Sequence, residues 1–366
     1  MSEHPHYSPD DEAMARVRQP LEKAWTLPPD AYTDPDCFAA EARTVFKRDW
    51  VCVARVDQLP NAGDYICADL VDQPIVITRD QDGALHALSR VCLHRAMPLA
   101  EGAGNTRRLV CPYHNWVYEL DGQLRTAPMM DGAVGFDVTQ CQLRRLRLET
   151  WQGFIFVNRD EKAAPLAPRL SGLEALVAGH GFATMRVVHT LEYDSPWNWK
   201  ILVENFMEAY HHIGTHRDSL QPTYPARESF VEDNHDQPWA FLRMPARDGS
   251  ELFAACVFPT FLFAAFDGLA VWYQLEPGAH DAMRLRIHAL TSPEVAATLD
   301  GPATEAVEAQ LRTVHEEDIE ANLGSWRGLQ ATLTRQGRLS PYEKAIWQLN
   351  QLWSQRISSA PLAVST

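Results

Sequence analysis

Two short segments of the chain each offer one cysteine and one histidine, and they constrain the fold more than any other feature. The first is Cys92-Leu93-His94, and the second, after the sixteen residues 95–110, is Cys111-Pro112-Tyr113-His114. Thiolates and imidazoles are ligands of zinc and iron in proteins. Turn-forming residues occur in and between the segments, at Pro98, Gly102, Gly104 and Pro112. We therefore expect two loops that present four ligands to one metal centre.

The way these ligands are divided favours a [2Fe-2S] cluster of the Rieske type. In such a cluster two cysteines bind one iron and two histidines bind the other. Neutral imidazoles in place of two thiolates leave the cluster less negative, so it accepts an electron more readily. The alternative is a structural Cys2His2 zinc site. Zinc fingers usually group their cysteines together and their histidines together, whereas here the two residue types alternate.

Short strands with tight turns are predicted around these loops, from Trp50 to about Asn158. Asp82-Gly83 and Asp121-Gly122 are typical of two-residue hairpin turns. The first pair separates β-prone runs at 75–78 and 84–88, and the second separates runs at 116–120 and 123–126. The pattern predicts a small antiparallel β domain.

The stretch 204–216 concentrates carboxylates and imidazoles and is interpreted as half of an iron site. At 100° per residue, Glu204 and Glu208 lie on one face of a helix, and His211 follows on the adjoining part of that face. His216 is five residues beyond His211 and would lie about 140° round an unbroken helix.

Both imidazoles therefore reach one metal only if the helix ends or bends between them. Gly214 permits this, since glycine enters backbone regions closed to other residues. The alternative pair is His212 with His216, a spacing of four that suits a metal on an intact helix. The glycine favours His211 over His212.

A third ligand is predicted far downstream, on a helix. Val307, Leu311, Val314 and Asp318 are spaced by four, three and four residues, so the aspartate continues an apolar row. A buried carboxylate is costly unless it is compensated, and a metal ion compensates it strongly. A helix cap or an ion pair with an arginine is the alternative. The neighbouring acids are interpreted as solvated, namely Glu316, Glu317 and Glu320.

Other strands and helix starts are predicted in the second half of the chain. Strands are expected at 186–193, 253–258, 261–266, 270–275 and 283–290. Ser195-Pro196 is predicted to begin the helix that carries the histidines. Asp34-Pro35 begins an earlier helix, and Ser340 with Glu343 forms a capping box for the closing one.

Taken together, these motifs resemble those of the Rieske non-haem iron oxygenases, the ring-hydroxylating oxygenases and their relatives. The order and separation of the family's two motifs are matched, and they cover most of the chain. The residues that resemble the Rieske signature are Cys92-Leu93-His94-Arg95, Cys111-Pro112-Tyr113-His114 and Asp121-Gly122. Those that resemble the mononuclear iron motif are Asn198-Trp199-Lys200, Glu204-Asn205, Glu208, Tyr210-His211 and His216.

The resemblance implies an α+β fold. A small antiparallel β Rieske domain would accompany a helix-grip, START-like catalytic domain with an antiparallel sheet and C-terminal helices. The implied domains are an N-terminal segment 1–45 that packs on the catalytic domain, a Rieske domain 46–158, and a catalytic domain 159–366.

The resemblance also implies the roles of the candidate site residues. His211, His216 and Asp318 would hold Fe(II) as a facial triad that leaves positions open for O2. Asn205 and Glu208 would be catalytic. The subunits would form a head-to-tail homotrimer, in which Glu208 would connect His211 of one subunit to the cluster ligand His94 of the next. The [2Fe-2S] ligands would be Cys92, His94, Cys111 and His114.

The implied activity is that of a terminal oxygenase. It would use O2 and electrons from NAD(P)H to hydroxylate, or oxidatively demethylate or cleave, a small organic substrate. The chain has no Gly-x-Gly-x-x-Gly after a strand, so a separate flavin and iron-sulfur reductase or a ferredoxin is expected to supply electrons. A hypothesis from another class is a Rieske electron carrier whose second domain only docks a partner.

Two departures from the family pattern bear on the chemistry. Asn115 stands where the family usually has glycine after the second Rieske histidine, which affects hydrogen bonding around the cluster. Glu208 stands where most members have aspartate. This glutamate resembles the variant in oxygenases that act on carnitine, glycine betaine and related quaternary amines.

The substrate is therefore predicted to be an N-methylated or quaternary amine, with an aromatic acid or ether as the alternative. Aromatic residues on the later strands would curve over the iron, although alternation along a strand sends only about half of them inward. Phe258, Phe266 and Trp272 are the candidate substrate-binding residues. Aromatic rings suit an aromatic substrate or a quaternary ammonium held by cation–π attraction.

Charge and hydropathy exclude several other classes of protein. A net charge of -15 argues against nucleic acid, whose phosphates need a basic surface. The longest apolar run, 252–266, contains Pro259 and falls short of about 18 residues, so no membrane span is predicted. No secretion signal is recognised at the N-terminus. With seven cysteines in such a chain, a reducing, cytoplasmic location is expected.

Overall fold

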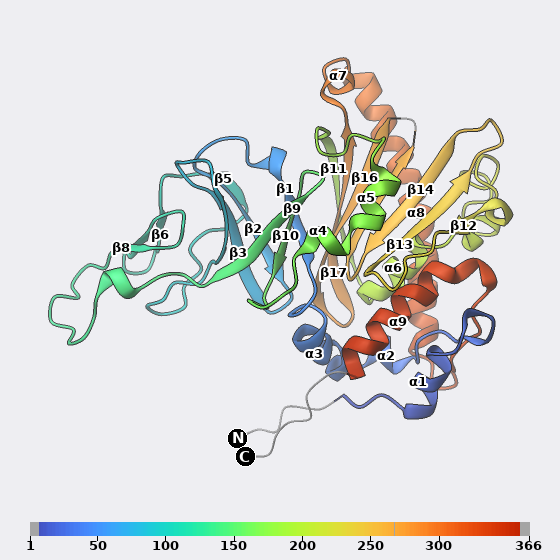
Figure 1. Ribbon diagram of the computed structural model, residues 1–366, viewed down its shortest axis with the longest axis horizontal. Helices are drawn as coiled ribbons and strands as arrows, with labels where there is room; N and C mark the ends of the chain where they lie inside the picture. The colour runs from blue at the N-terminus through green and yellow to red at the C-terminus, as the bar shows by residue number, and fades with distance from the viewer. Residues whose placement is uncertain (1–6, 267, 359–366) are drawn as a thin grey trace. The chain divides into compact units, whose positions relative to one another are not determined.

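The computed structural model describes residues 7–266 and 268–358 (Figure 1). The chain forms two compact units. The small unit is Trp50–Ala164, and the large unit combines Met1–Asp49 with Pro165–Thr366. Each unit has its own antiparallel sheet, so each is described by itself.

The small unit is built from ten short strands (Figure 1). They are β1 Val51–Arg55, β2 Asp64–Leu70, β3 Gln73–Arg79, β4 Leu85–Ser89, β5 Ala103–Asn105, β6 Leu109–Val110, β7 Val117–Tyr118, β8 Leu124–Thr126, β9 Arg145–Trp151 and β10 Phe154–Asn158. Seven form one sheet in the order β1-β10-β9-β4-β3-β2-β5, and β6, β7 and β8 form a second. The small antiparallel β domain that the sequence predicts is confirmed.

Both predicted hairpins form, but their loops are longer than two residues. The β3–β4 loop covers 80–84, because the Asp80 carboxylate accepts hydrogen bonds from the backbone N–H groups of Asp82 and Ala84 at 3.0 and 2.8 Å. Such Asx turns stabilise a wider loop than a two-residue turn. Gly83 and Gly122 have φ of +86° and +93°, the left-handed region that favours glycine.

The core of the small unit extends to the ligand loops. Cys92 and Cys111 are only 3% and 1% exposed. Both pack in one cluster with buried side chains from the sheet and the loops, among them Val76, Leu88 and Tyr118. The two thiols are therefore fixed by hydrophobic packing as well as by the chain around them.

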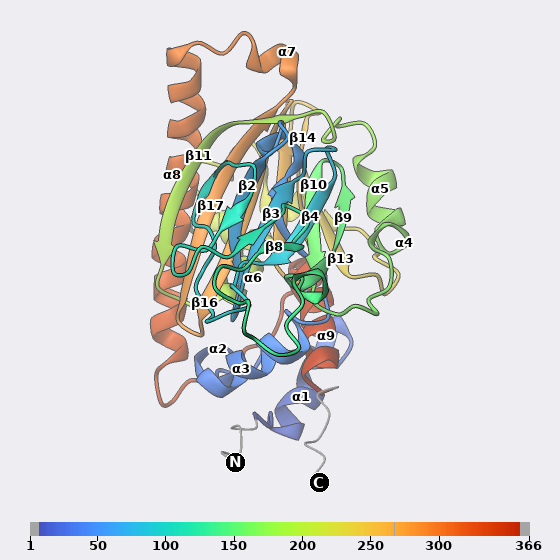
Figure 2. The same cartoon turned by 90° about the vertical axis from the view of Figure 1, so that its left-hand side faces the viewer.

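The large unit contains one seven-stranded antiparallel sheet (Figures 1 and 2). Its strands are β11 Arg186–Ser195, β12 Phe230–Val231, β13 Trp239–Pro245, β14 Glu251–Val257, β15 Phe261–Phe266, β16 Leu269–Ala279 and β17 Ala282–Thr291. The order is β11-β17-β16-β15-β14-β13-β12. All five predicted strands are present, and β12 and β13 extend the sheet at one edge.

Helices of the large unit pack around this sheet. They are α1 Asp11–Val17, α2 Asp30–Thr33, α3 Pro35–Thr44, α4 Leu166–Arg169, α5 Ser171–Val177, α6 Trp199–Phe206, α7 Pro293–Ala296, α8 Gly301–Leu329 and α9 Lys344–Ser358. The long helix α8 lies beside β11 (Figure 2) and also contacts α6. None of the helices in the described part of the chain has the length and hydropathy that crossing a bilayer requires.

Two of the three predicted helix starts are confirmed and one is wrong. The Asp34 side chain accepts from the Asp36 N–H at the start of α3, and the Ser340 capping box opens a short 3-10 helix before α9. Ser195, however, is the last residue of β11. The N-cap of α6 is Asn198, whose side chain accepts from the Lys200 N–H. The strand pairing of Ser195 with Met283 continues the β ladder past the predicted start.

A buried charged cluster joins three helices of the large unit. The Glu41 carboxylate on α3 is fully buried and accepts from Lys200 Nζ at 2.5 Å and from the indole N–H groups of Trp199 and Trp353 at 2.9 and 2.6 Å. A buried carboxylate is tolerated only when such donors compensate its lost hydration. The cluster therefore fixes α6, from which the histidine segment leaves, against α3 and α9.

Candidate metal centres

The first ligand loop of the small unit is held by its own backbone. Cys92 N–H donates to Met97 O at 2.9 Å, and Ala96 N–H donates to Cys92 O at 3.1 Å. The Tyr118 hydroxyl accepts from the Leu93 N–H at 3.0 Å and lies 3.3 Å from Cys92 Sγ. Because the hydroxyl accepts from the backbone, its own proton is available to the sulfur.

The second ligand loop repeats the same hydrogen bonds. Cys111 N–H donates to Trp116 O at 2.8 Å, and Asn115 N–H donates to Cys111 O at 3.0 Å. Asn115 has φ of +56°, and Ala96, at the same position of the first loop, has φ of +55°. Asparagine enters this left-handed region more readily than most residues. The replacement of the family's usual glycine therefore keeps the loop conformation.

The two histidines of these loops lie close together, with ring centroids 4.6 Å apart. Trp116 stacks on His94, with centroids 4.9 Å apart and planes within 4°. His114 Nδ1 is buried and has no hydrogen-bond partner among the described residues. Burial, His94 and Arg95 lower the pKa of His114 below its usual value. A neutral imidazole with one uncommitted nitrogen is the form that binds a metal.

The spread of these donors bears on the choice between a cluster and zinc. Among the described residues Cys92, His94, Cys111 and His114, no three offer ligand atoms that all lie within 4.8 Å of one another. A tetrahedral zinc needs its donors about 2.0–2.3 Å from one ion, and therefore close to each other. A two-iron cluster, whose cysteines and histidines bind different irons, does not require all four donors to meet at one ion.

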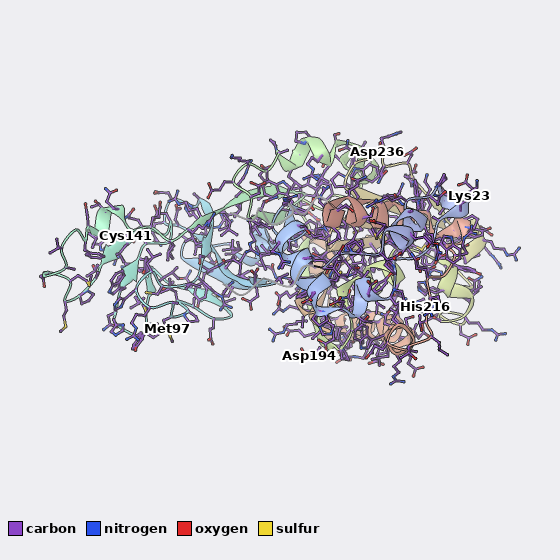
Figure 3. All side chains as sticks on the ribbon, turned by 90° about the horizontal axis from the view of Figure 1, so that it is seen from below. Lys23, Met97, Cys141, Asp194, His216 and Asp236 are labelled. Carbon is purple, nitrogen blue, oxygen red and sulfur yellow. The ribbon has the colours of Figure 1, made fainter. Side chains whose placement is uncertain are left out.

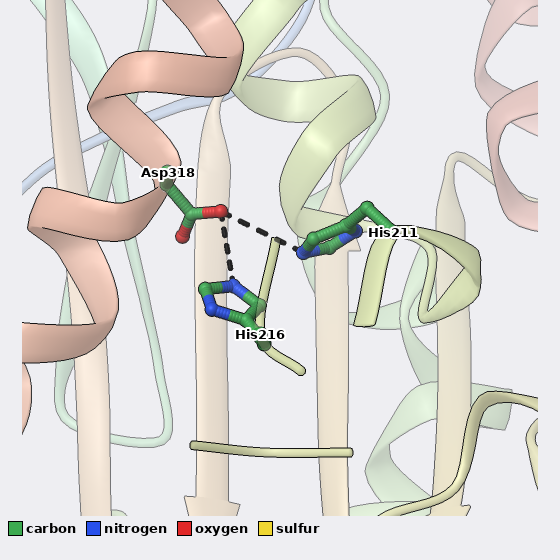
Figure 4. Close-up of side chains that lie close together, drawn as sticks. All are labelled: His211, His216 and Asp318. Atoms are coloured by element: carbon green, nitrogen blue, oxygen red, sulfur yellow. Dashed lines mark ion pairs between the residues drawn. The ribbon is translucent and has the colours of Figure 1, made fainter. Parts of the chain in front are cut away.

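The second centre lies in the large unit and joins His211, His216 and Asp318 (Figure 4). Their ligand atoms all lie within 4.8 Å of one another. Asp318 Oδ1 is 3.1 Å from His216 Nε2 and 3.6 Å from His211 Nε2. His216, which is labelled in Figure 3, is 1% exposed and Asp318 is 7% exposed, so both side chains are buried in the large unit.

Local structure explains how one short segment supplies both imidazoles. α6 ends at Phe206, and His211 lies on a separate 3-10 helix, η4 Tyr210–Ile213. His211 O accepts from the N–H groups of Gly214 and Thr215 at 2.9 and 2.8 Å, which turns the chain toward His216. The break is therefore present, but Gly214 has φ of -114°, so its left-handed freedom is not what produces it.

His212 is placed differently from His211. Its Nδ1 lies 3.1 Å from Tyr224 O, and it is outside the group of three that gathers around Asp318. Burial, followed by the charge of His211, lowers the pKa of His212 to about 4. The structure therefore brings His211, and not His212, together with His216 and Asp318, as the sequence predicts.

Neighbouring polar groups orient each member of the triad. The Glu208 carboxylate accepts from the His211 N–H at 2.9 Å and pairs with His211 Nδ1 at 2.7 Å, which leaves Nε2 directed at Asp318. Asn205 Nδ2 donates to Asp318 Oδ1 at 3.1 Å. Burial alone would raise the pKa of Asp318, but hydrogen bonds and charge from His216, His211 and Asn205 lower it.

Glu317 is a functional candidate that the sequence interpretation missed. It was predicted to be solvated, but its Oε2 lies 2.6 Å from His216 Nδ1 and accepts from Ser219 Oγ at 2.6 Å. Ligand histidines commonly bond a carboxylate through their other nitrogen. Nothing in the spacing of Glu317 distinguishes it from Glu316, so only the fold reveals the contact.

A cavity of about 820 Å3, counted with its open mouth, adjoins the triad. Besides His211, His212, His216 and Asp318, its wall consists of Asn205, Phe206, Glu208, Leu220, Tyr224, Met244, Leu252, Ala254, Ala264, Phe266, Val271, Tyr273, Gln310, Leu311 and Val314. Leu311 and Val314 belong to the apolar row predicted from the spacing of Asp318.

One of the three candidate substrate-binding residues, Phe266, lines this cavity. Trp272 does not, because its neighbours Val271 and Tyr273 face the cavity and alternate residues of a strand point to opposite sides. Its ring instead stacks on His288, with centroids 4.5 Å apart. Phe258 lies beyond the end of β14 and lines a different, smaller pocket with Lys200.

Comparison with known proteins relates both units to families. Residues 49–147 match the Rieske [2Fe-2S] domain, and residues 182–359 match the catalytic domain of the ring hydroxylating alpha subunit. The crystal structure of the quaternary ammonium Rieske monooxygenase CntA in complex with L-carnitine is similar, with a TM-score of 0.82 and 26% identity. That similarity covers 95% of this chain and 98% of CntA.

Two curated relatives are carnitine monooxygenase oxygenase subunits. The protein from Escherichia coli is 37% identical over 193 residues, and the one from Acinetobacter baumannii is 32% identical over 267 residues. The matched parts are 52% of each chain in the first case and 70% of each in the second, so the chain spans about half the length of the first relative. With a Rieske domain, this catalytic domain and these relatives, the chain belongs to the Rieske non-haem iron oxygenases, among the ring-hydroxylating alpha subunits.

Proposed function

We propose that this chain is a terminal oxygenase that hydroxylates or oxidatively demethylates an N-methylated or quaternary amine. It would use O2 together with electrons from NAD(P)H, delivered by a separate reductase or ferredoxin. The observation that carries the proposal is the convergence of His211, His216 and Asp318 beside a cavity, in a chain that also has a Rieske domain. The similarity to carnitine monooxygenase oxygenase subunits supports the amine as substrate.

The two centres would be held by the residues that the resemblance implies. His211, His216 and Asp318 would bind Fe(II), and the [2Fe-2S] cluster would be bound by Cys92, His94, Cys111 and His114. The bound iron would supply oxygen activation, and the cluster would supply electrons one at a time.

The polar neighbours of the triad would keep its ligands in a binding geometry. Glu208 holds His211 with Nδ1 toward the carboxylate, and Glu317 does the same for His216. Both imidazoles then direct Nε2 toward Asp318, so little reorganisation is needed when the metal binds. The amide of Asn205 restricts the rotation of Asp318.

We further propose that the active form is a head-to-tail homotrimer. In it Glu208 would bridge His211 to His94 of a neighbouring subunit, so that electrons cross the interface. Large apolar side chains are exposed beside both centres, Leu93 and Tyr113 near the cluster loops and Tyr210 and Ile213 near Glu208. Such exposed groups support an interface. A cytoplasmic location, where thiols stay reduced, is part of the same proposal.

Iron content combined with oxygen uptake tests the function. An oxygenase should contain about three irons per chain, whereas an electron carrier should contain about two. In the presence of a reductase and NADH, oxygen uptake should rise on addition of a quaternary amine and an aldehyde should be released. A full complement of iron with no substrate-dependent oxygen uptake would contradict the proposal. If only aromatic acids raise oxygen uptake, the substrate is an aromatic acid and not an amine.

A further inference from the structure

The charges and rings in the cavity wall indicate which amines it accepts. Its acidic side chains are Glu208 and Asp318, and within the described lining no lysine or arginine accompanies them. Beside the triad, Phe206 and Tyr273 have ring centroids 4.9 Å apart and planes inclined by 57°, which forms an aromatic corner. Aromatic faces attract N-methylated cations. The aromatic corner next to the metal ligands therefore suits an N-methylated cation.

The far end of the cavity is defined by the same helix that carries Asp318. Val314, Leu311 and Gln310 on α8 line the wall at increasing distance from it. At 1.5 Å per residue, Gln310 is about 12 Å from Asp318 along the helix axis. Gln310 is exposed, so it lies at the mouth. A substrate whose N-methyl group reacts at the triad would place its other end near this amide.

We propose that the cavity selects N-methylated or quaternary amines whose far end carries no negative charge, and that Gln310 determines this choice. The inference rests on the proposed function and deepens it by naming the substrate class. A neutral amide can donate to and accept from an uncharged polar end, but it supplies no charge to a carboxylate. Zwitterionic amines with a terminal carboxylate are then poor substrates.

Desolvation explains why a carboxylate would be disfavoured. Between Gln310 and the triad the wall is apolar, with Leu311 and Val314 on one side. A carboxylate that enters this space loses water without gaining an ion pair, because the described lining offers it no lysine or arginine. An uncharged end of equal size loses much less hydration.

A matched pair of ligands tests the selection. γ-Butyrobetaine and its primary amide differ only in whether the far end is a carboxylate or an uncharged carboxamide. Their dissociation constants are measured by calorimetry on the iron-loaded, oxygen-free protein, so that binding is separated from turnover. The amide should bind about tenfold tighter or more, because an unpaired charge costs more than a neutral group.

Variants at the mouth test the role of Gln310. Gln310→Lys should strengthen carboxylate binding about two- to fivefold, as expected for an exposed ion pair, and the gain should shrink in high salt. Ala309→Lys is the matched control, because it adds the same charge at the neighbouring exposed position outside the cavity lining. It should leave the ratio of the two dissociation constants unchanged.

The possible outcomes separate this inference from the proposed function. Equal or tighter binding of the carboxylate by the unmodified protein would overturn the inference and leave the oxygenase proposal intact. Binding of neither ligand would overturn the amine assignment and the inference with it. If Gln310→Lys leaves the ratio of the two dissociation constants unchanged, the role of Gln310 is refuted. The same holds if Ala309→Lys changes this ratio as much as Gln310→Lys does.

Discussion

At the scale of single residues, the carboxylates around the triad have different tasks that their contacts distinguish. Asp318 points at the imidazoles of His211 and His216, and Glu208 and Glu317 each hold the other nitrogen of one of these imidazoles. Glu204 contacts neither ring. Instead, the Tyr32 hydroxyl lies 2.8 Å from both oxygens of Glu204. Replacing these acids should therefore have separable effects on metal binding and stability.

Glu317→Gln should weaken binding of the mononuclear iron by about 10- to 100-fold, the usual effect of losing a carboxylate that orients a ligand histidine. The iron-sulfur cluster should stay, because its ligands are in the small unit. Equilibrium dialysis with Fe(II) measures the affinity. Glu316→Gln, at the exposed neighbouring position, is the control. Equal affinity in both variants would show that Glu317 does not position His216.

Glu204→Gln should change how stability depends on pH. Burial, opposed by the hydrogen bond from Tyr32, raises the pKa of Glu204 from 4.5 to about 7. Between these values the folded protein keeps a proton that the unfolded chain loses, so the group's contribution to stability falls as the pH rises, by up to about 1.4 kcal/mol per pH unit. Below pH 4.5 the contribution is fully present, and above about 7 it is lost.

Urea unfolding at pH 5 and pH 8 measures this effect. We compare the free energy of unfolding of Glu204→Gln with that of the unmodified protein at each pH. This difference should shift in favour of the variant from pH 5 to pH 8, by on the order of 1–3 kcal/mol. Parallel stability curves for the two proteins would contradict the raised pKa of Glu204.

At the scale of elements, the position of the histidine segment depends on how α6 is anchored. α6 is only eight residues long and ends before the ligands, so its direction comes from packing against α3 and α9. The spacing of Glu204, Glu208 and His211 predicted one helix, whereas the structure has α6 followed by η4. Periodicity could not show this break, because the hydrogen bonds that form it involve the backbone of His211.

Lys200→Met should destabilise the large unit by about 3–5 kcal/mol, since it leaves the buried Glu41 carboxylate without its charged partner. Chemical unfolding followed by tryptophan fluorescence reports the change, because Trp199 and Trp353 donate to the same carboxylate. Lys47→Met removes a charge at an exposed position of the same region and should change stability by less than about 0.5 kcal/mol. A loss of similar size in both variants would contradict a structural role for the buried pair.

At the scale of the whole molecule, the two metal centres belong to units with separate cores. The cysteines of the small unit are packed in its own hydrophobic cluster, and the triad is assembled from η4, the turn after it and α8 of the large unit. Loss of one centre should therefore leave the other in place.

Asp318→Ala should lose the mononuclear iron and keep the coloured cluster. Iron and sulfide analysis together with the visible spectrum measures both in one sample. Iron should fall from about three to about two per chain, while labile sulfide stays constant. Retention of the third iron would contradict the assignment of Asp318 as a ligand.

Glu208→Gln should keep both metals but slow the transfer of electrons between them. The carboxylate can accept a hydrogen bond from one imidazole on each of its two oxygens, whereas the amide has one accepting oxygen and an NH2 donor, so the proposed bridge between subunits is lost. Rapid mixing of the reduced protein with O2 and substrate measures reoxidation of the cluster. Reoxidation at the unmodified rate, with both metals present, would exclude the bridging role.

The sequence by itself determined the fold class and predicted the two candidate ligand sets, because metal ligands and β-strands leave patterns in local spacing. Cys92 with His94 and Cys111 with His114 were visible as pairs, and Asp318 was visible as a carboxylate in an apolar row. Tertiary structure decided what spacing does not encode: the contact of Glu317 with His216, the orientation of Trp272 away from the cavity, and the place of Gln310 at its mouth. These depend on which side chains from distant segments meet, and only the packing of sheet and helices brings such segments together.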